Sequence, residues 1–253
     1  MSFFRDAIGT LQAYIPGQQP APGTKVIKLN TNENPYSPSP AALAALKAFN
    51  GEGLRRYPNP LGQEFREAAA DVLAIDPNWI LPGNGSDDLL TMLVRAVAGP
   101  KRPVVYPRPT YVLYRTLAAI QEAPVVEVPF DDNFLLPSQA LIEARGALTF
   151  VANPNSPSGT TASRDQLAAL AQSLDGLLVI DEAYAAFADE DALGLVKHMD
   201  NVVILRTLSK SHALAGLRLG FAVARPSIIE GLIKVKDSYN LDSVATSVGA
   251  AAI

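Results

Sequence analysis

Four short motifs combine residue types that could carry out chemistry together. They are GNGSDD (83–88), NPNSPSGT (153–160), VIDEAY (179–184) and RTLSKSHALAGLR (206–218). Each one contains or follows a short apolar run of the kind that forms a buried strand. Ligand chemistry in alternating α/β folds collects beyond the carboxyl ends of the strands, so these motifs could share one site.

The first motif is a glycine turn that opens a helix. Backbone N–H groups and the helix dipole at such a turn favour an anion, usually a phosphate. The pattern is a near miss to the dinucleotide-binding pattern, because Asp88 stands where the third glycine should be. A helix that is simply capped by Ser86 explains the same residues equally well, so this motif needs support from the others.

The second and third motifs follow or complete apolar strands. Turn residues after the apolar run 148–152 are typical of a plain loop, and only their place at the sheet edge favours a functional loop. In the third motif the apolar strand ends in Asp181. A buried acid is costly unless a cation or ligand pairs with it, although a helix-capping aspartate is the simpler alternative.

The fourth motif places Lys210 among small and hydroxyl residues between two apolar strands. A lysine in such surroundings can be partly desolvated, which favours a nucleophilic amine, whereas most lone lysines are merely solvated. Ser209 is adjacent to Lys210, so the two side chains point apart in a strand, and no G-x-S-x-G motif is present; both facts argue against a serine–lysine hydrolase. A phosphate-binding turn, a strand-end acid and a lysine followed by an arginine match the needs of pyridoxal phosphate, which takes a Schiff-base lysine, a carboxylate and cations.

The elements that must position these motifs alternate between strands and helices from about residue 79. We expect strands at 79–81, 104–106, 125–128, 148–152, 177–180, 202–205 and 219–223. We expect helices at 40–49, 61–73, 86–97, 111–120, 164–172 with Ser163 as N-cap, 227–236 and 244–253. This alternation predicts an α/β fold with a mainly parallel sheet sandwiched by helices. The first 38 residues are rich in Pro, Gly and Asn and predict an arm in which only 25–30 forms a strand.

Composition narrows the classes of protein. The chain has 253 residues, 48% of them hydrophobic, with 21 Lys+Arg and 25 Asp+Glu, so there is no basic excess for nucleic acid. It has no cysteine and two histidines, which excludes disulfides and Cys-ligated or multi-histidine metal sites. We expect no metal, no nucleic acid and no membrane span, and the absence of a signal-peptide pattern favours the cytoplasm.

The chain resembles the fold-type I aminotransferases, and among them most the histidinol-phosphate aminotransferases. The motifs LNTNENPYSPSP, RRYPNPLG, GNGSDDLL, PTYVLY, NPNSPSGT, VIDEAY and RTLSKSHALAGLRLGF carry the resemblance in this order. It implies a pyridoxal-phosphate enzyme of histidine biosynthesis that transaminates histidinol phosphate with 2-oxoglutarate or glutamate. An aromatic amino-acid aminotransferase, a threonine-phosphate decarboxylase and a truncated chain that binds cofactor without turnover remain alternatives.

The resemblance assigns roles around the cofactor ring. Lys210 would bind the cofactor covalently and move the substrate's α-proton. Asp181 would pair with the pyridine nitrogen, Tyr184 would hydrogen-bond the phenolic oxygen, and Tyr111 would stack on the ring.

The resemblance also assigns the phosphate end. The residues that would hold the phosphate are Gly85, Ser86, Asp87, Ser209 and Arg218. Tyr57 would reach the cofactor phosphate of a neighbouring subunit, which implies a homodimer with shared sites.

Two positions depart from the family pattern. The family's Asn-Asn-Pro-Thr-Gly reads Asn-Ser-Pro-Ser-Gly here, so the usual cofactor-contacting asparagine falls on Ser156, and Asn155 is kept as a candidate contact. His212 replaces an aromatic or apolar residue; a supporting or surface role is expected, and modulation of Lys210 is the alternative.

The resemblance implies two structural parts. Relatives continue with a small C-terminal domain that supplies an arginine for the substrate carboxylate, whereas this chain stops at Ile253 within a helical pattern. We therefore expect 39–253 to be the large cofactor-binding domain, truncated at its C-terminus. Residues 1–38 would be an arm that belongs with the small domain, which is expected to be missing.

Overall fold

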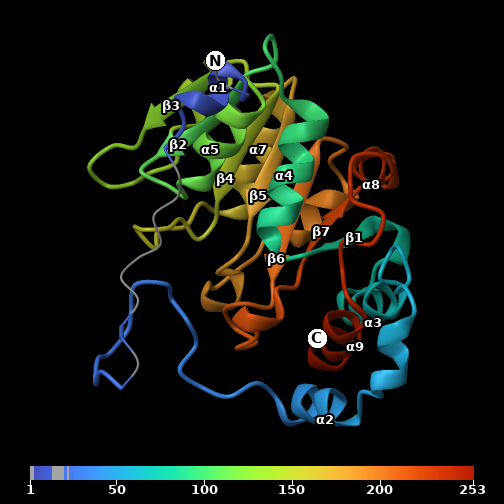
Figure 1. Ribbon diagram of the computed structural model, residues 1–253. Helices are drawn as coiled ribbons and strands as arrows, with labels where there is room; N and C mark the ends of the chain where they lie inside the picture. Colours follow the sequence, from blue (N-terminus) through green and yellow to red (C-terminus); the bar gives the residue numbers. More distant parts are fainter. Residues whose placement is uncertain (1–2, 13–19, 22) are drawn as a thin grey trace.

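A seven-stranded sheet forms the centre of the computed structural model, which describes residues 3–12, 20–21 and 23–253 (Figure 1). The strand order is β1-β7-β6-β5-β4-β2-β3. The strands are β1 (Ile80–Gly83), β2 (Val104–Arg108), β3 (Val125–Pro129), β4 (Leu148–Ala152), β5 (Leu177–Asp181), β6 (Val202–Thr207) and β7 (Gly220–Ala224). Only β7 runs against its two neighbours, while the other pairings are parallel. The expected mainly parallel sheet is confirmed.

Helices surround this sheet and include all those expected from the sequence. They are α1 (Asp6–Gly9), α2 (Pro40–Ala48), α3 (Gln63–Leu73), α4 (Ser86–Val97), α5 (Leu113–Ile120), α6 (Ser138–Glu143), α7 (Arg164–Ser173), α8 (Pro226–Ile233) and α9 (Ser243–Ala252). The short helices α1 and α6 were not expected. The expected strand at 79–81 is partly replaced by a 3₁₀ turn, Pro77–Trp79, that leads into β1.

Local sequence signals explain where two helices begin. The Ser39 hydroxyl accepts a hydrogen bond from the Ala42 N–H, and Pro40 occupies the first turn of α2, where its missing donor costs nothing. Ser163 and Gln166 form a reciprocal capping box at the start of α7. The predicted Ser163 cap is therefore confirmed.

Two apolar cores lie on opposite faces of the sheet. On β5, Val179 packs in the core beneath α4, α5 and α8, whereas Leu178 and Ile180 pack in the core with α3, α6, α7 and α9. This alternation is the period of two that a strand imposes on its side chains. Each fully buried Val, Leu or Ile contributes about 1.5–3 kcal/mol relative to exposure, so the alternation fixes the register of the central strands.

The expected strand at 25–30 is wrong. These residues form neither a helix nor a strand and pair with no strand among the described residues, and Val26, Ile27 and Leu29 are exposed. An isolated apolar run gains nothing as a strand without a sheet edge to join. The rest of the predicted arm is irregular apart from α1, and residues 1–2, 13–19 and 22 of it lie outside the described residues.

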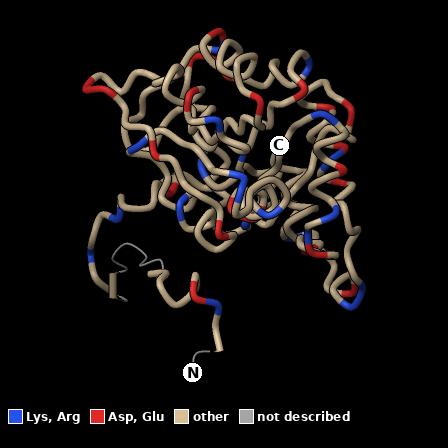
Figure 2. The backbone as a smooth tube through the Cα atoms, turned by 90° about the horizontal axis from the view of Figure 1, so that it is seen from above, with Lys and Arg blue, Asp and Glu red and all other residues tan. Residues whose placement is uncertain are grey.

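Charged residues of both signs are spread along the chain. In Figure 2 the Lys and Arg positions are interspersed with the Asp and Glu positions and do not gather on one basic face. Across the described residues, no helix is both long and apolar enough to cross a membrane.

Candidate active site

The predicted motifs meet at one edge of the sheet. Strands β1, β4, β5 and β6 all end there, and the antiparallel β7 begins there, so Gly85, Asp181, Lys210 and Arg218 are brought together. A cavity of about 600 Å³ opens at this edge. It is lined by Asn30, Thr31, Asn32, Ser86, Asp87, Tyr111, Val112, Leu113, Thr116, Ala152, Pro154, Ser156, Asp181, Ala183, Tyr184, Thr207, Ser209, Lys210 and Arg218.

Asp181, the last residue of β5, is the buried acid of the cavity. It is 5% exposed, and its carboxylate accepts hydrogen bonds from Tyr114 Oη at 2.8 Å and from the Ala183 N–H at 3.2 Å. Burial raises the pKa of the Asp181 carboxyl, and these two hydrogen bonds lower it by less. Within the described part of the chain no cation pairs with Asp181, so a ligand with a positively charged or N–H donor in the cavity would relieve its burial.

Tyr114 is a site residue that the sequence reasoning missed. Its fully buried ring stacks on Phe150, with centroids 4.5 Å apart and planes inclined by 6°. Burial and then the Asp181 charge raise the pKa of the Tyr114 phenol well above its ordinary value, so the phenol keeps its proton and donates to Asp181. Its position three residues after Tyr111, within the helix expected at 111–120, is the signal that could have found it.

Lys210 and Tyr184 both line the cavity. The Lys210 Nζ lies 5.6 Å from the centroid of the Tyr184 ring and donates to the Thr31 carbonyl at 2.8 Å. The Tyr184 Oη accepts a hydrogen bond from Asn32 Nδ2 at 2.9 Å, and Asn34 Nδ2 donates to the Lys210 carbonyl at 3.0 Å. The arm segment that carries these three residues therefore contacts both predicted catalytic side chains.

The start of α4 forms the polar end of the cavity. Gly85 precedes this helix with φ of +79°, and a Cβ added there would collide with the Arg218 guanidinium. Arg218 Nη2 lies 3.3 Å from Asp87 Oδ2, and its Nη1 donates to Ser209 Oγ at 3.4 Å. Tyr111 Oη donates to the other Asp87 oxygen at 3.1 Å. An arginine, two hydroxyls and a helix N-terminus thus converge where the glycine turn predicted an anion.

Asn155 does not reach the cavity with its side chain. It is buried in the loop after β4, where its amide accepts from Thr110 Oγ1 at 2.8 Å and donates to Ser158 Oγ at 2.8 Å and the Pro109 carbonyl at 3.2 Å. Ser156 lines the cavity instead. The Asn155 side chain therefore holds this loop together, and Ser156 is the one of the two residues that lines the cavity.

Two other predicted residues lie away from this cavity. Tyr57 is 81% exposed and stacks on Tyr239, with ring centroids 4.5 Å apart. His212 contacts Ser211 Oγ at 3.0 Å and lines a separate cavity of about 210 Å³ beside Glu182 and Arg206. Burial lowers the pKa of the His212 imidazole, and no hydrogen bond joins it to Lys210 among those of the described residues.

The residues of the larger cavity fit pyridoxal phosphate. The cavity is lined by the Lys210 amine, the buried Asp181 carboxylate that lacks a paired cation, the Tyr111 ring, and Arg218, which stands at a helix start where a Cβ on Gly85 would collide with it. These are the groups that an aromatic aldehyde with a ring nitrogen and a phosphate requires. In the described part of the chain, no group of three or more His, Cys, Asp or Glu residues is placed to hold a metal ion.

Comparisons with known proteins agree with this geometry. The chain is 57% identical over 252 residues to histidinol-phosphate aminotransferase 1 of Trichormus variabilis, a match that covers 100% of this chain and 72% of the relative. It is 49% identical over 253 residues to histidinol-phosphate aminotransferase of Rhodopirellula baltica, covering 99% and 69%.

A solved structure and a family model extend the agreement. The crystal structure of histidinol-phosphate aminotransferase from Sinorhizobium meliloti in complex with pyridoxal-5'-phosphate superposes with a TM-score of 0.88 at 28% identity, covering 100% of this chain and 71% of that one. Residues 24–253 match the family described as aminotransferase class I and II. The expected family and the large-domain fold are confirmed, and the chain belongs to the aminotransferase class I and II family.

Proposed function

We propose that this protein is a histidinol-phosphate aminotransferase that uses pyridoxal phosphate. It transfers an amino group between histidinol phosphate and 2-oxoglutarate or glutamate, in histidine biosynthesis. The observation that carries the proposal is the arrangement of Lys210, the cation-free Asp181 and Arg218 around one cavity in a chain of this family. Residues 39–253 act as the cofactor-binding domain, and residues 1–38 act as an arm.

The ring end of the site holds and moves protons. When bound, pyridoxal phosphate supplies an aldehyde that condenses with amines and a ring that withdraws electrons. Asp181, oriented by Tyr114, would hold a proton on the ring nitrogen. Lys210 Nζ would hold the cofactor through its aldehyde carbon, whose oxygen leaves as water, and would take and return the proton at the substrate's α-carbon. Tyr184 Oη would donate to the phenolic oxygen.

The phosphate end of the site binds and orients. The phosphate is held by Gly85, Ser86, Asp87, Ser209 and Arg218, where backbone N–H groups at the start of α4 supplement the guanidinium. Tyr111 covers the ring. Asp87 currently accepts from both Tyr111 and Arg218, which keeps those two side chains at the cavity.

Tyr57 serves a neighbouring copy of the chain. Its 81% exposure and its distance from the cavity of its own chain support contact with a second subunit, which makes the enzyme a homodimer with shared sites. The cytoplasm is its proposed location.

The choice of histidinol phosphate rests on the relatives. Those that match nearly the whole chain at 47–57% identity carry the name histidinol-phosphate aminotransferase. The alternative substrates, aromatic amino acids and threonine phosphate, are not favoured, and neither is a chain without turnover.

A substrate panel tests the proposal. The purified protein is incubated with pyridoxal phosphate and dialysed. Amino transfer to 2-oxoglutarate is then measured with histidinol phosphate, phenylalanine and tyrosine, and release of CO2 is measured with threonine phosphate. We expect cofactor absorbance that survives dialysis and a kcat/KM at least tenfold higher for histidinol phosphate. Lys210→Ala should lose both the retained absorbance and the turnover. Retention of both by that variant would contradict the role of Lys210, and preference for another donor would contradict the substrate.

A further inference from the structure

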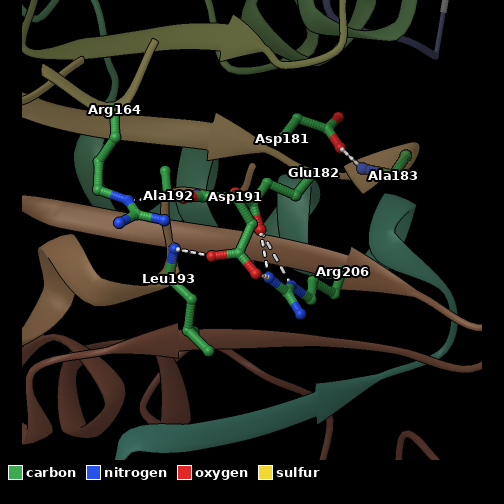
Figure 3. A network of polar contacts seen from close by, with 8 residues as sticks. All are labelled: Arg164, Asp181, Glu182, Ala183, Asp191, Ala192, Leu193 and Arg206. Atoms are coloured by element: carbon green, nitrogen blue, oxygen red, sulfur yellow. Dashed lines mark hydrogen bonds and ion pairs between the residues drawn. The ribbon is translucent and has the colours of Figure 1, made fainter. Parts of the chain in front are cut away.

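A group of three charged residues, centred on the buried Glu182, lies behind the candidate active site. The Glu182 side chain has no exposed surface, and its Oε2 accepts hydrogen bonds from Arg206 Nε at 2.9 Å and from Arg206 Nη2 at 2.8 Å. Arg206 Nη2 also lies 2.7 Å from Asp191 Oδ2 (Figure 3). Both carboxylates are therefore joined to one guanidinium, and we call these three residues the carboxylate–arginine triad.

The strand period places this triad on the opposite face of the sheet from Asp181. Asp181 accepts a hydrogen bond from Tyr114 on α5. Glu182, the next residue, points toward Arg206 and the 191–193 segment (Figure 3). The β5–β6 pairing sets Asp181 against Leu205, and the Glu182 N–H donates to the Leu205 carbonyl at 2.9 Å. Adjacent residues of the same two strands thus build the site on one face and the triad on the other.

The triad binds both ends of the segment that carries Tyr184. The segment leaves β5 at Glu182 and returns at Asp191, and both ends are bound to Arg206. Its return is further fixed where Glu182 Oε1 accepts from the Ala192 N–H and Asp191 Oδ1 accepts from the Leu193 N–H at 3.1 Å. Arg206 itself belongs to β6, which leads within four residues to Lys210. One guanidinium therefore joins the segment that carries Tyr184 to the strand that leads to Lys210.

Stability alone is a weak reason for this arrangement. Burial raises the pKa of the Glu182 carboxyl and Arg206 lowers it by less, so the pair carries a desolvation cost. Replacing a buried ion pair by apolar residues is often neutral or stabilising. What a planar, bidentate guanidinium adds is a fixed geometry between the groups that it joins.

We propose that Arg206 is a positioning residue. Through its bonds to Glu182 and Asp191, it fixes the Tyr184 phenol relative to Lys210. The cofactor contact of Tyr184 rests on the proposed function, whereas the position of the phenol does not. Arg206→Lys keeps the charge but loses the planar fork, so it cannot hold both carboxylates in the same geometry.

The test reads the position of Tyr184 directly. With 3-fluorotyrosine at position 184, ¹⁹F NMR of the protein before and after addition of pyridoxal phosphate should give one sharp resonance for the unmodified sequence. Arg206→Lys should shift and broaden it in both states. Arg225→Lys is the matched control, because Arg225 also pairs with an acid, Asp200, at 3.0 Å but lies beyond the far end of β7, and it should leave the resonance in place. An unchanged resonance in Arg206→Lys would overturn the proposal.

Two further measurements separate positioning from unfolding and from failure of the function. Asp191→Asn removes one of the two ion pairs of Arg206 at a half-exposed position. It should shift the resonance in the same direction but less, even if Arg206→Lys does not fold.

In a double-mutant cycle, Arg206→Lys should weaken cofactor binding about tenfold with Tyr184 present and less than about twofold in Tyr184→Phe. Additive effects would overturn the proposal, whereas a protein that binds no cofactor but shows the resonance shift would overturn only the proposed function.

Discussion

Tyr114 Oη donates a 2.8 Å hydrogen bond to Asp181 Oδ2, and both side chains are buried on the α5 side of the sheet. The phenol is clamped by its stack on Phe150 and by the edge-on ring of Tyr111, 5.7 Å away. The orientation of the Asp181 carboxylate thus depends on a residue of another element, α5.

Tyr114→Phe should therefore lower the activity while keeping the packing of the apolar core. The variant removes one donor to a buried charged acceptor, which costs about 1.5–3 kcal/mol. The pKa of the Asp181 carboxyl should rise further, so the acid limb of the kcat/KM profile should move to higher pH and kcat should fall about tenfold. Tyr106→Phe, which loses a 2.9 Å bond to Glu127 outside the cavity, is the control and should leave the pH profile in place. Coinciding profiles for the two variants would contradict this role of Tyr114.

Asp181→Asn should raise the stability of the cofactor-free chain and lower its activity. In the cofactor-free chain the folded state binds the Asp181 proton more tightly than the unfolded state, because burial raises the folded pKa. Stability should therefore fall as pH rises through that raised pKa, and the variant should be less pH-dependent and more stable by about 1–3 kcal/mol at neutral pH. Its turnover should fall by orders of magnitude, since an amide does not hold a positively charged ring nitrogen. Thermal unfolding at several pH values and steady-state kinetics measure the two effects, and near-normal turnover would remove Asp181 from its role.

The sequence was sufficient for most of the fold because apolar strands alternate with helices that have clear beginnings. The start of α4 at Ser86, the whole of β4 and the Ser163 cap agree with the structure residue by residue. Strand-end motifs such as VIDEAY also predicted which residues would meet, since parallel strands end at one edge.

Other features depend on distant partners and could not be read from local pattern. Tyr114 serves Asp181 from 67 positions away, and Asn32 reaches Tyr184 across 152 positions. The apolar 25–30 run has the composition of a strand but no edge to join. The role of Asn155 depends on how its loop folds. Its amide hydrogen-bonds Thr110 and Ser158, and the local motif does not reveal these bonds.

Asn155→Ala should consequently act on the loop rather than on the cofactor. It removes three side-chain hydrogen bonds from a buried position, at about 1–3 kcal/mol in unfolding free energy. Ser156→Ala, whose residue lines the cavity, should lose little stability but should weaken cofactor binding several-fold. Denaturant unfolding and cofactor titration of both variants check this division, and it is wrong if Asn155→Ala binds cofactor weakly while unfolding like the unmodified protein.

Gly85→Ala should weaken the phosphate end of the site specifically. Gly85 and Gly159 both have positive φ, +79° and +72°, so an alanine at either position costs about 1–3 kcal/mol of backbone strain. A Cβ at Gly159 meets nothing within 4 Å, whereas a Cβ at Gly85 collides with the Arg218 guanidinium and must displace it from the start of α4. The two variants should lose similar stability, but only Gly85→Ala should lose affinity for pyridoxal phosphate, by at least about tenfold, with a smaller loss for pyridoxal, which lacks the phosphate. Equal losses for both ligands in Gly85→Ala would mean that the turn supports the fold and not the phosphate, because a displaced guanidinium acts on the anion alone.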